Sequence, residues 1–380
     1  MKHPILLFIR RFLGRIVLLA NLGAIVWLGL CVAAAYTHPA TIRYIALFSL
    51  STPFAVLANI LFIFAWLIFS THKLRALLSA VAIIASFNVV SPIFAFNYFK
   101  DNDFSHRPNT VRIMHWNVHG IGLFDEPYSN AQRERIITYL DSVDADVMSL
   151  PEFAVKKTEI TSQTAKKILE NGNYKDYRFQ ADNTLGKNIF LGTAVFSRYE
   201  IFNFKAHKLS DYIYMLQCDM ALPGADTTRM FFVHLNTFGL SDNDKDYIED
   251  VANNKKADLN RSRSYMWKFN YAFLRRAREV KVAKSIIDAS PYPVVICGDL
   301  NDLPGSYTYT QMREGLNDAF LQRGRGLGRT YSRLSPTLRI DYIFYNPASF
   351  SCIGYKSPYT SLSDHNPVIT NLEIINRPER

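Results

Sequence analysis

The first 100 residues of this 380-residue chain contain no aspartate and no glutamate. They hold eight basic residues, which account for most of the formal net charge of +10. The other 280 residues have 35 basic and 33 acidic side chains, so that part of the chain is nearly neutral. The strong positive charge therefore belongs to the N-terminal region, and it does not indicate a surface for nucleic acid.

Cysteine is scarce as well, and its spacing is irregular. The chain has four cysteines, of which Cys31 lies inside an apolar run, and this pattern excludes a disulfide scaffold or a metal-binding knuckle. Cys218, Cys297 and Cys352 allow at most one disulfide, and the sequence favours no pair. Internal repeats and low-complexity tracts are lacking. A hydrophobic content of 49% excludes a disordered chain.

Three long apolar runs fill the acid-free region, at roughly 16–36, 44–70 and 76–97. Each can cross a hydrocarbon core of about 30 Å at about 1.5 Å per residue. A cleaved signal peptide has a shorter apolar core without two further runs behind it, and a water-soluble helical bundle needs polar faces. We therefore predict an all-α membrane anchor over residues 1–100 with three transmembrane helices.

Basic residues flank these runs unequally. Four of them lie between positions 2 and 15, before the first run, and Lys73 and Arg75 lie between the second and third runs. The positive-inside rule then places the N-terminus in the cytoplasm. Because three spans carry the chain across, we predict a multi-pass protein of the bacterial inner (cytoplasmic) membrane, with everything after the anchor in the periplasm.

From about residue 110 the pattern changes to short β-rich runs and polar helices. Strands are predicted at 111–118, 145–150, 189–197, 229–236, 293–298, 340–345 and 366–374, and helices at 129–142, about 156–171 and about 246–289. This pattern predicts an α/β domain over residues 110–380, which follows a linker at 101–109.

Polar residues that can bind metal or phosphate stand at the ends of these apolar strands. They are Asn117, Glu152, His234, Asp299, Asn301, Asp341, Asp364 and His365. Strand ends are rigid positions at which binding groups converge. Taken singly each signal is weak, since Gly298–Asn301 fits an ordinary turn and a lone histidine is usually structural. The ordered set is the informative feature.

In that order these residues resemble the endonuclease/exonuclease/phosphatase superfamily, and the resemblance covers residues 110–374. Its most specific pieces are the segments 298–301 (Gly-Asp-Leu-Asn), 339–344 and 363–368 (Ser-Asp-His-Asn-Pro-Val). The superfamily includes deoxyribonucleases, abasic-site endonucleases, neutral sphingomyelinases and inositol polyphosphate 5-phosphatases. The resemblance implies a two-sheet β-sandwich flanked by helices, a four-layer fold, in the region that follows the anchor.

The resemblance also implies a metal site. Glu152 is similar to the family's main carboxylate ligand, with Asn117 and Asp364 contributing to the same region. Hard oxygen ligands suit Mg²⁺ or Mn²⁺. Many family members have glutamine before this glutamate, whereas this chain has Pro151. The substitution leaves the ligand in place.

Catalytic roles are implied residue by residue. Asp299 is similar to the group that orients and deprotonates the attacking water, and His365, paired with Asp341, to the imidazole beside the scissile phosphate. Asn301 and His234 would donate hydrogen bonds to phosphate oxygens. The sequence leaves open whether the family's base is the aspartate or the histidine.

Two basic stretches are candidates for binding a polyanion. Residues 323–333 combine glycine with arginine, and we predict Arg325, Arg329 and Arg333 as substrate-binding residues because such a loop can surround a phosphate. The second stretch, 255–284, has ten basic residues but is also explained as a solvated helix face.

The sequence thus predicts a divalent-metal-dependent hydrolase of phosphoester bonds, an endonuclease or phosphodiesterase. The alternative is a lipid-headgroup or inositol-phosphate phosphodiesterase or phosphatase of the same superfamily, and a third hypothesis is a catalytically silent membrane binding protein. The expected partners are a phosphate-ester substrate, either nucleic acid or a lipid headgroup, and the membrane, in which the protein is integral. No protein partner is predicted.

Overall fold

The computed structural model describes residues 4–122, 130–156, 162–224, 227–252, 258–335 and 337–375. The chain divides into two compact units, one formed by Met1–Ile93 with Pro304–Thr310 and the other by Phe94–Leu303 with Gln311–Arg380.

The first unit consists mainly of apolar helices, namely α1 (Pro4–Tyr36), α2 (Thr52–Phe69), α3 (Ala76–Ala85) and α4 (Phe87–Val90). In the part of the chain that the structure describes, two helical stretches, Phe12–Tyr36 and Ile45–Phe69, are each long and apolar enough to cross a membrane. The third predicted span is a pair of helices, Lys73–Ala85 and Phe87–Ile93, bent by 68°. The bend falls at Ser86, whose hydroxyl donates to the carbonyl of Ala82 at 2.7 Å, and serine is a known source of kinks.

Polar side chains join the three apolar helices inside this unit. The Asn21 side-chain amide of α1 donates to the Ser79 hydroxyl of α3 at 2.6 Å and accepts from the Trp66 indole of α2 at 2.8 Å. Asn59 of α2 donates to the carbonyl of Ala24 in α1 at 3.0 Å. Such hydrogen bonds hold apolar helices together in a lipid environment, where burial of apolar surface offers little driving force.

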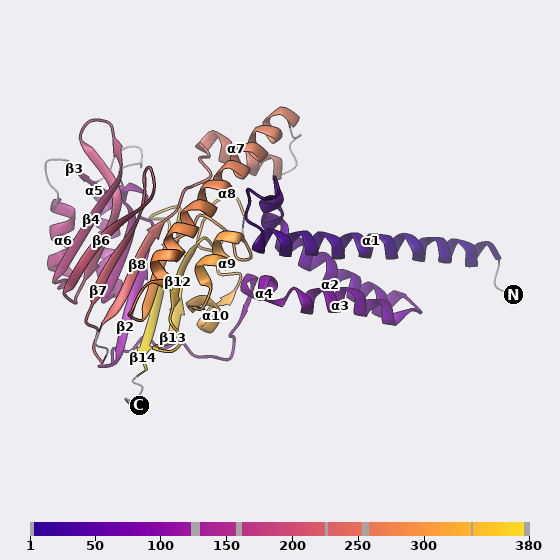
Figure 1. Ribbon diagram of the computed structural model, residues 1–380, viewed down its shortest axis with the longest axis horizontal. Helices are drawn as coiled ribbons and strands as arrows, with labels where there is room; N and C mark the ends of the chain where they lie inside the picture. The colour runs from indigo at the N-terminus through magenta and orange to yellow at the C-terminus, as the bar shows by residue number, and fades with distance from the viewer. Residues whose placement is uncertain are drawn as a thin grey trace. The chain divides into compact units, whose positions relative to one another are not determined.

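The second unit is built on two six-stranded sheets in the described residues (Figure 1). One has the strand order β13-β14-β2-β3-β5-β4 and the other the order β10-β12-β9-β8-β7-β6. The strands of the first sheet are β2 (Thr110–His115), β3 (Val147–Lys156), β4 (Asp176–Leu185), β5 (Ile189–Ser197), β13 (Phe350–Lys356) and β14 (Val368–Ile374). Those of the second are β6 (Ile201–Ser210), β7 (Ile213–Met220), β8 (Thr228–His234), β9 (Val294–Asp299), β10 (Asn317–Asp318) and β12 (Asp341–Tyr345). A short ribbon of β1 (Ala95–Phe96) and β11 (Arg325–Gly326) completes the strands.

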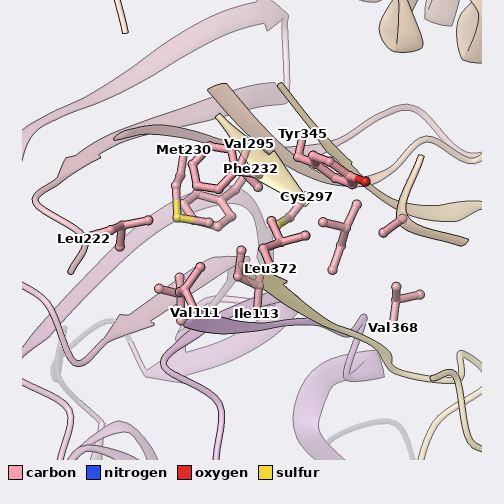
Figure 2. Packing of buried hydrophobic residues seen from close by; sticks show 14 of the residues in the cluster. Val111, Ile113, Leu222, Met230, Phe232, Val295, Cys297, Tyr345, Val368 and Leu372 are labelled. Carbon is pink, nitrogen blue, oxygen red and sulfur yellow. The ribbon is translucent and has the colours of Figure 1, made fainter. Parts of the chain in front are cut away.

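The hydrophobic core of this unit lies between the two sheets. Val111 and Ile113 of the first sheet pack in one cluster with Phe232 and Val295 of the second, together with Leu372 (Figure 2). All of these side chains are almost fully buried. Cys218, Cys297 and Cys352 belong to the same cluster, and all four cysteines of the chain are buried and free of disulfides.

Helices cover the outer faces of the sheets (Figure 1). Those that pack on the strands are α5 (Asn130–Val143), α6 (Gln163–Asn171), α8 (Leu259–Asp288) and α10 (Ala319–Arg323). The described chain also contains α7 (Asp242–Ala252) and α9 (Tyr307–Arg313). Apolar residues of α5 and α6 form a second cluster with β2, β3 and β5, while α8 packs against β6 on the other sheet. The predicted sandwich with helices on both sides is confirmed.

Residues 101–109, predicted as a linker, lie against the first sheet. The backbone amide of Asp103 donates to the carbonyl of Ile353 in β13 at 2.9 Å, and the Asn371 side chain of β14 donates to the carbonyl of Asp103 at 3.1 Å. Arg112 of β2 also donates to the carbonyl of Phe104. This segment is therefore packed onto the domain that it was expected to precede.

A buried ion pair gives a test of the packing around α10. Arg339 Nη1 lies 2.7 Å from Asp318 Oδ2, and both side chains are at most 1% exposed. Removing one partner leaves the other charge buried and unpaired, which costs about 3–5 kcal/mol. We expect Arg339→Met to lower the free energy of unfolding by about that amount, as measured by urea denaturation of the full-length protein in detergent.

The matched control is Glu134→Gln, which removes the exposed pair between Glu134 and Lys167. Exposed pairs contribute less than about 1 kcal/mol, so this variant should unfold as the wild type does. A loss in Arg339→Met no larger than that of the control would contradict the buried-pair account.

Candidate active site

Strand register places three polar side chains side by side at one end of the second sheet. Strand β9 pairs in parallel with β8, where Asp299 faces His234, and antiparallel with β12, where Asp299 faces Asp341. Residues in register on adjacent strands project from the same face of a sheet. Three residues that the sequence placed at separate strand ends therefore form one row.

Glu152 reaches the site from the first sheet through an irregularity in β3. The register of β3 against β5 shifts between Leu150 and Phe153, and Glu152 has a positive φ of 54°. A β-bulge of this kind re-aims a side chain, and such bulges are common next to active sites. Pro151, the departure from the family pattern, lies within this bulge.

Asn117 connects the residues of the two sheets. Its Nδ2 donates to Glu152 Oε1 at 3.0 Å and to Asp299 Oδ2 at 3.2 Å, while its Oδ1 accepts from the backbone amide of His119 at 3.1 Å. In this arrangement Asn117 orients both carboxylates. Its role as a metal ligand stays a prediction.

The two carboxylates predicted to bind metal both lie beside one imidazole. His119 Nδ1 is 3.6 Å from Glu152 Oε2 and 3.5 Å from Asp364 Oδ1. Burial alone would raise the pKa of Glu152, but the hydrogen bond from His119, the charge of His234 and the Asn117 amide lower it to about 2. Glu152 is therefore ionised at neutral pH, as a metal ligand must be.

His365 and Asp341 form the predicted pair. His365 Nδ1 lies 3.0 Å from Asp341 Oδ2, and the backbone of Asp341 is fixed by a hydrogen bond to the buried hydroxyl of Thr330 at 3.1 Å. Burial would lower the pKa of His365, but the charges of Asp341 and Asp299 raise it to about 10. The imidazole is therefore a cation at neutral pH, with Nδ1 as the donor to Asp341.

Asp299 is the buried carboxylate at the centre of the site. Its Oδ1 accepts from the backbone amide of Asn301 at 3.0 Å, and its Oδ2 is 3.7 Å from His234 Nε2 and 3.8 Å from His365 Nδ1. Burial and the negative charge of Asp341 raise the pKa of Asp299 to about 6. Such a carboxylate is a better proton acceptor than an exposed one.

Three polar residues of the site were not found from the sequence. His115 is fully buried with Nε2 3.7 Å from Asp341 Oδ1, and burial lowers its pKa to about 4. His115 ends β2 two residues before Asn117, and this period of two was a usable signal, whereas a turn brings His119 to the site. Asp182 gave no signal, because it lies in the polar strand β4; burial raises its pKa to about 7.

The three predicted arginines make contacts outside this cluster. Arg325 donates to the carbonyls of Asn97 at 3.2 Å and Lys100 at 3.0 Å, beside β1. Arg329 donates to the carbonyl of Tyr331 at 2.7 Å, and Arg333 pairs with Asp246 at 2.6 Å. Their role in substrate binding stays a prediction.

A pocket of about 340 Å³ opens beside the cluster. Its lining residues include Glu152, Asp182, His234, Asn236 and Arg275. The lining is mainly neutral or acidic, with one arginine. The pocket can therefore admit a compact polar group next to the predicted metal ligands.

Two sets of residues have the donors that a divalent cation needs. One is Glu152 with Asp364, which are partly exposed and carry hard oxygen ligands. The other is Asp299, Asp341 and His365, whose donor atoms all lie within 4.8 Å of one another. The second set is fully buried, and its histidine is already paired with Asp341, so the first set is the better candidate.

Comparison with known proteins agrees with this geometry. A family model described as the endonuclease/exonuclease/phosphatase family matches residues 114–365, well over half of the chain. A second model, a domain of unknown function (DUF8431), matches residues 14–93. No curated protein sequence matches the chain.

Solved structures with the same fold show little sequence identity. The catalytic domain of human Nocturnin with bound sulfate has a TM-score of 0.52 at 16% identity, covering 72% of this chain and 97% of that one. An endonuclease/exonuclease/phosphatase from Beutenbergia cavernae has a TM-score of 0.50 at 20% identity, covering 70% and 72%. These likenesses concern the fold, and the sequence resemblance is confirmed by the family model. The chain belongs to the endonuclease/exonuclease/phosphatase family, whose members hydrolyse phosphoester bonds.

Proposed function

We propose that this protein is a divalent-metal-dependent phosphoester hydrolase that uses an activated water. The observation that carries the proposal is the contact, through Asn117, between Glu152 of the predicted metal site and Asp299 of the predicted catalytic site. A phosphate beside Glu152 and a water held by Asp299 would therefore be neighbours, as in-line attack requires.

Glu152 and Asp364 would hold the metal, with Mg²⁺ or Mn²⁺ as the proposed ion. Both carboxylates are 20% exposed, so an ion and a phosphate can reach them from solvent. When bound, the cation would supply Lewis-acid stabilisation of charge on the phosphoryl oxygens. The Asn117 amide keeps the Glu152 carboxylate in place for this contact.

Asp299 is the proposed general base. His365 carries a proton at neutral pH because two carboxylates face it, so it cannot accept another one from water. Asp299 is buried, is ionised above about pH 6, and is held by the backbone amide of Asn301. This division of roles is our proposed choice between the two groups that the sequence left open.

The cationic His365 would stabilise negative charge on the phosphate as the bond breaks. Its Nδ1 proton is committed to Asp341, which fixes the ring and leaves Nε2 as the donor toward substrate. His234 Nε2 is buried with no hydrogen-bond partner among the described residues, so it is available to a phosphate oxygen. The Asn301 side chain donates to the carbonyl of Leu235 at 2.9 Å, which fixes the amide at the edge of the site.

Charge in the domain supports a compact phosphate ester or a lipid headgroup better than a long nucleic acid. In the basic stretch 255–284, Arg276 is fully buried beside Asp302, and Lys268 pairs with Asp244 at 2.7 Å. These cations are thus neutralised within the protein, whereas duplex binding relies on several cations that face the phosphates. Nucleic acid, which the sequence analysis placed first, becomes the alternative substrate in this proposal.

Hydrolysis assays on the full-length protein in detergent and in lipid nanodiscs test the proposal. The panel would contain a generic phosphodiester, sugar and inositol phosphates, sphingomyelin, RNA and plasmid DNA, each with Mg²⁺, Mn²⁺ or chelator. We expect metal-dependent release of phosphate or alcohol from a small ester or headgroup. Turnover of DNA or RNA alone would favour the alternative, and no turnover with bound metal would favour a silent binding protein.

We also propose that the catalytic domain is periplasmic in a bacterial inner membrane, with three spans and a cytoplasmic N-terminus. The apolar helices and their basic flanks support this orientation. A reporter enzyme that works only outside the cytoplasm should be active when it is fused after Arg380. Activity of a reporter that functions only in the cytoplasm would overturn the orientation.

A further inference from the structure

The cluster contains an imidazole that the proposed chemistry does not use. His119 lies two residues after Asn117, and its Nδ1 faces Glu152 and Asp364 at once, at 3.6 Å and 3.5 Å. We propose that His119 is a direct metal ligand, and that with Glu152 and Asp364 it forms a site of one nitrogen and two oxygens that prefers Mn²⁺ or a later first-row ion to Mg²⁺. This inference rests on the proposed function.

The separations from His119 to the two carboxylates are near those of ligands of a single ion, although the three donors do not yet lie within 4.8 Å of one another as those of Asp299, Asp341 and His365 do in the described residues. Ligands bonded at about 2.1 Å lie about 3.0 Å apart around an octahedral ion and about 3.4 Å apart around a tetrahedral one. The His119 Nδ1 separations of 3.6 Å and 3.5 Å are close to the tetrahedral value and exceed the octahedral one by about half an ångström, so a small shift of the groups would bring them to an octahedral ion. The ring is 40% exposed, so it can rotate without displacing packed side chains.

The backbone after Asn117 makes a turn that brings the imidazole to the carboxylates. His119, Gly120 and Ile121 have positive φ values of 44°, 73° and 50°. Two of these residues are not glycine, and such conformations persist where the surrounding contacts demand them, often at ligand sites. The His119 amide donates to Asn117 Oδ1 at 3.1 Å and the Ile121 amide to the carbonyl of Val118 at 2.8 Å, which hold the turn.

The ligand set decides which ion is favoured. Mg²⁺ prefers oxygen ligands and water. Mn²⁺ and the later first-row ions also accept imidazole, and the later ions bind it more strongly than Mn²⁺ does. Affinity of a mixed nitrogen and oxygen site rises from Mn²⁺ along the first row. One histidine among the ligands thus shifts the preference of the site away from Mg²⁺.

The competing reading is that His119 acts only as a cation that holds two carboxylates together. Binding of Mn²⁺ to the full-length protein in detergent separates the two readings, with pulsed electron paramagnetic resonance as the readout. Direct ligation gives a ¹⁴N coupling to the bound Mn²⁺. We expect this coupling in the wild type, its loss in His119→Ala, and its persistence in His234→Ala, in which the other nearby imidazole is removed.

Calorimetric titrations of the same proteins provide the second measurement. His119→Ala should weaken Mn²⁺ and Co²⁺ binding by about tenfold or more, while His119→Asp, which supplies an oxygen ligand, should retain Mg²⁺ binding. A Mn²⁺ site without nitrogen coupling, or with a coupling that survives His119→Ala, would overturn this inference and leave the proposed function standing. Failure of the wild type to bind any divalent ion would overturn both.

Discussion

Asp299→Asn should lower kcat by about 10³-fold with little change in metal affinity. The substitution keeps the size of the side chain and an oxygen that can accept from the Asn301 amide, but it removes the group that we assign to deprotonate water. The pH profile provides a second signature. Because burial and Asp341 raise the pKa of Asp299 to about 6, the wild-type rate should fall as the pH drops through that value.

The asparagine variant should lack this acidic limb, since its side chain does not titrate. The His365→Gln variant is the matched comparison, because it removes a cation from the same site but leaves Asp299 in place. We expect it to be slow and to keep the acidic limb. A rate within about fivefold of wild type in Asp299→Asn would mean that another group is the base.

Glu152→Gln should weaken divalent-metal binding by about 100-fold or more and abolish turnover at low metal concentration. The amide matches the carboxylate in size but lacks its negative charge. In the wild type His119, His234 and Asn117 stabilise that charge and lower the pKa of Glu152. Excess metal should restore part of the activity, because the defect lies in binding. Isothermal titration calorimetry and rate measurements over a range of metal concentration check both statements.

Rescue by metal distinguishes this variant from Asp299→Asn, whose defect lies in the chemical step. Glu134→Gln is the control, since Glu134 is 52% exposed in α5 and pairs with Lys167. It should bind metal and turn over substrate as the wild type does. Wild-type metal affinity in Glu152→Gln would show that the ion is held elsewhere, with the buried set around Asp299 as the next candidate.

Most strands in the interior of the two sheets could be predicted from their apolar runs. The prediction 189–197 coincides with β5, and β9 and β12 were found to within a residue at each end. The edge strands β4 and β6 were missed because they have one neighbour and remain partly exposed, so their sequences are polar. The edge strand β13 and the interior strand β7 were missed as well, although most of their residues are buried. The helix predicted over 246–289 is two helices, α7 and α8, and residues 253–257 between them lie outside the described part of the chain.

The clustering of the candidate residues was predictable because most of them follow apolar strands. Asp299 and Asp341 lie on the neighbouring strands β9 and β12, in register with each other. Both strands are interior strands of one sheet, and for that reason their sequences are hydrophobic and could be found. Asp182 was not predictable, because it occupies an edge strand in which polar residues are expected at most positions. His119 was overlooked because a turn, rather than a strand, brings it to the carboxylates.

The glycine-arginine loop shows how a sequence pattern can have a packing cause. A Cβ on Gly324 would lie 2.2 Å from the Phe320 ring, and one on Gly328 would lie 2.3 Å from it. Both positions therefore require glycine so that the loop can pass over Phe320. The glycines are explained without a phosphate, which leaves the arginines as the part of that prediction still to be tested.

The central claim is that Glu152 and Asp364 bind the ion on which hydrolysis depends. The most direct measurement is the rate of phosphoester hydrolysis by full-length protein stripped with chelator and then titrated with Mn²⁺ or Mg²⁺. The account predicts no turnover after stripping, saturable recovery with added metal, and recovery shifted to much higher metal concentration in Glu152→Gln. Turnover that persists in the stripped protein, or equal recovery in the variant, would contradict it.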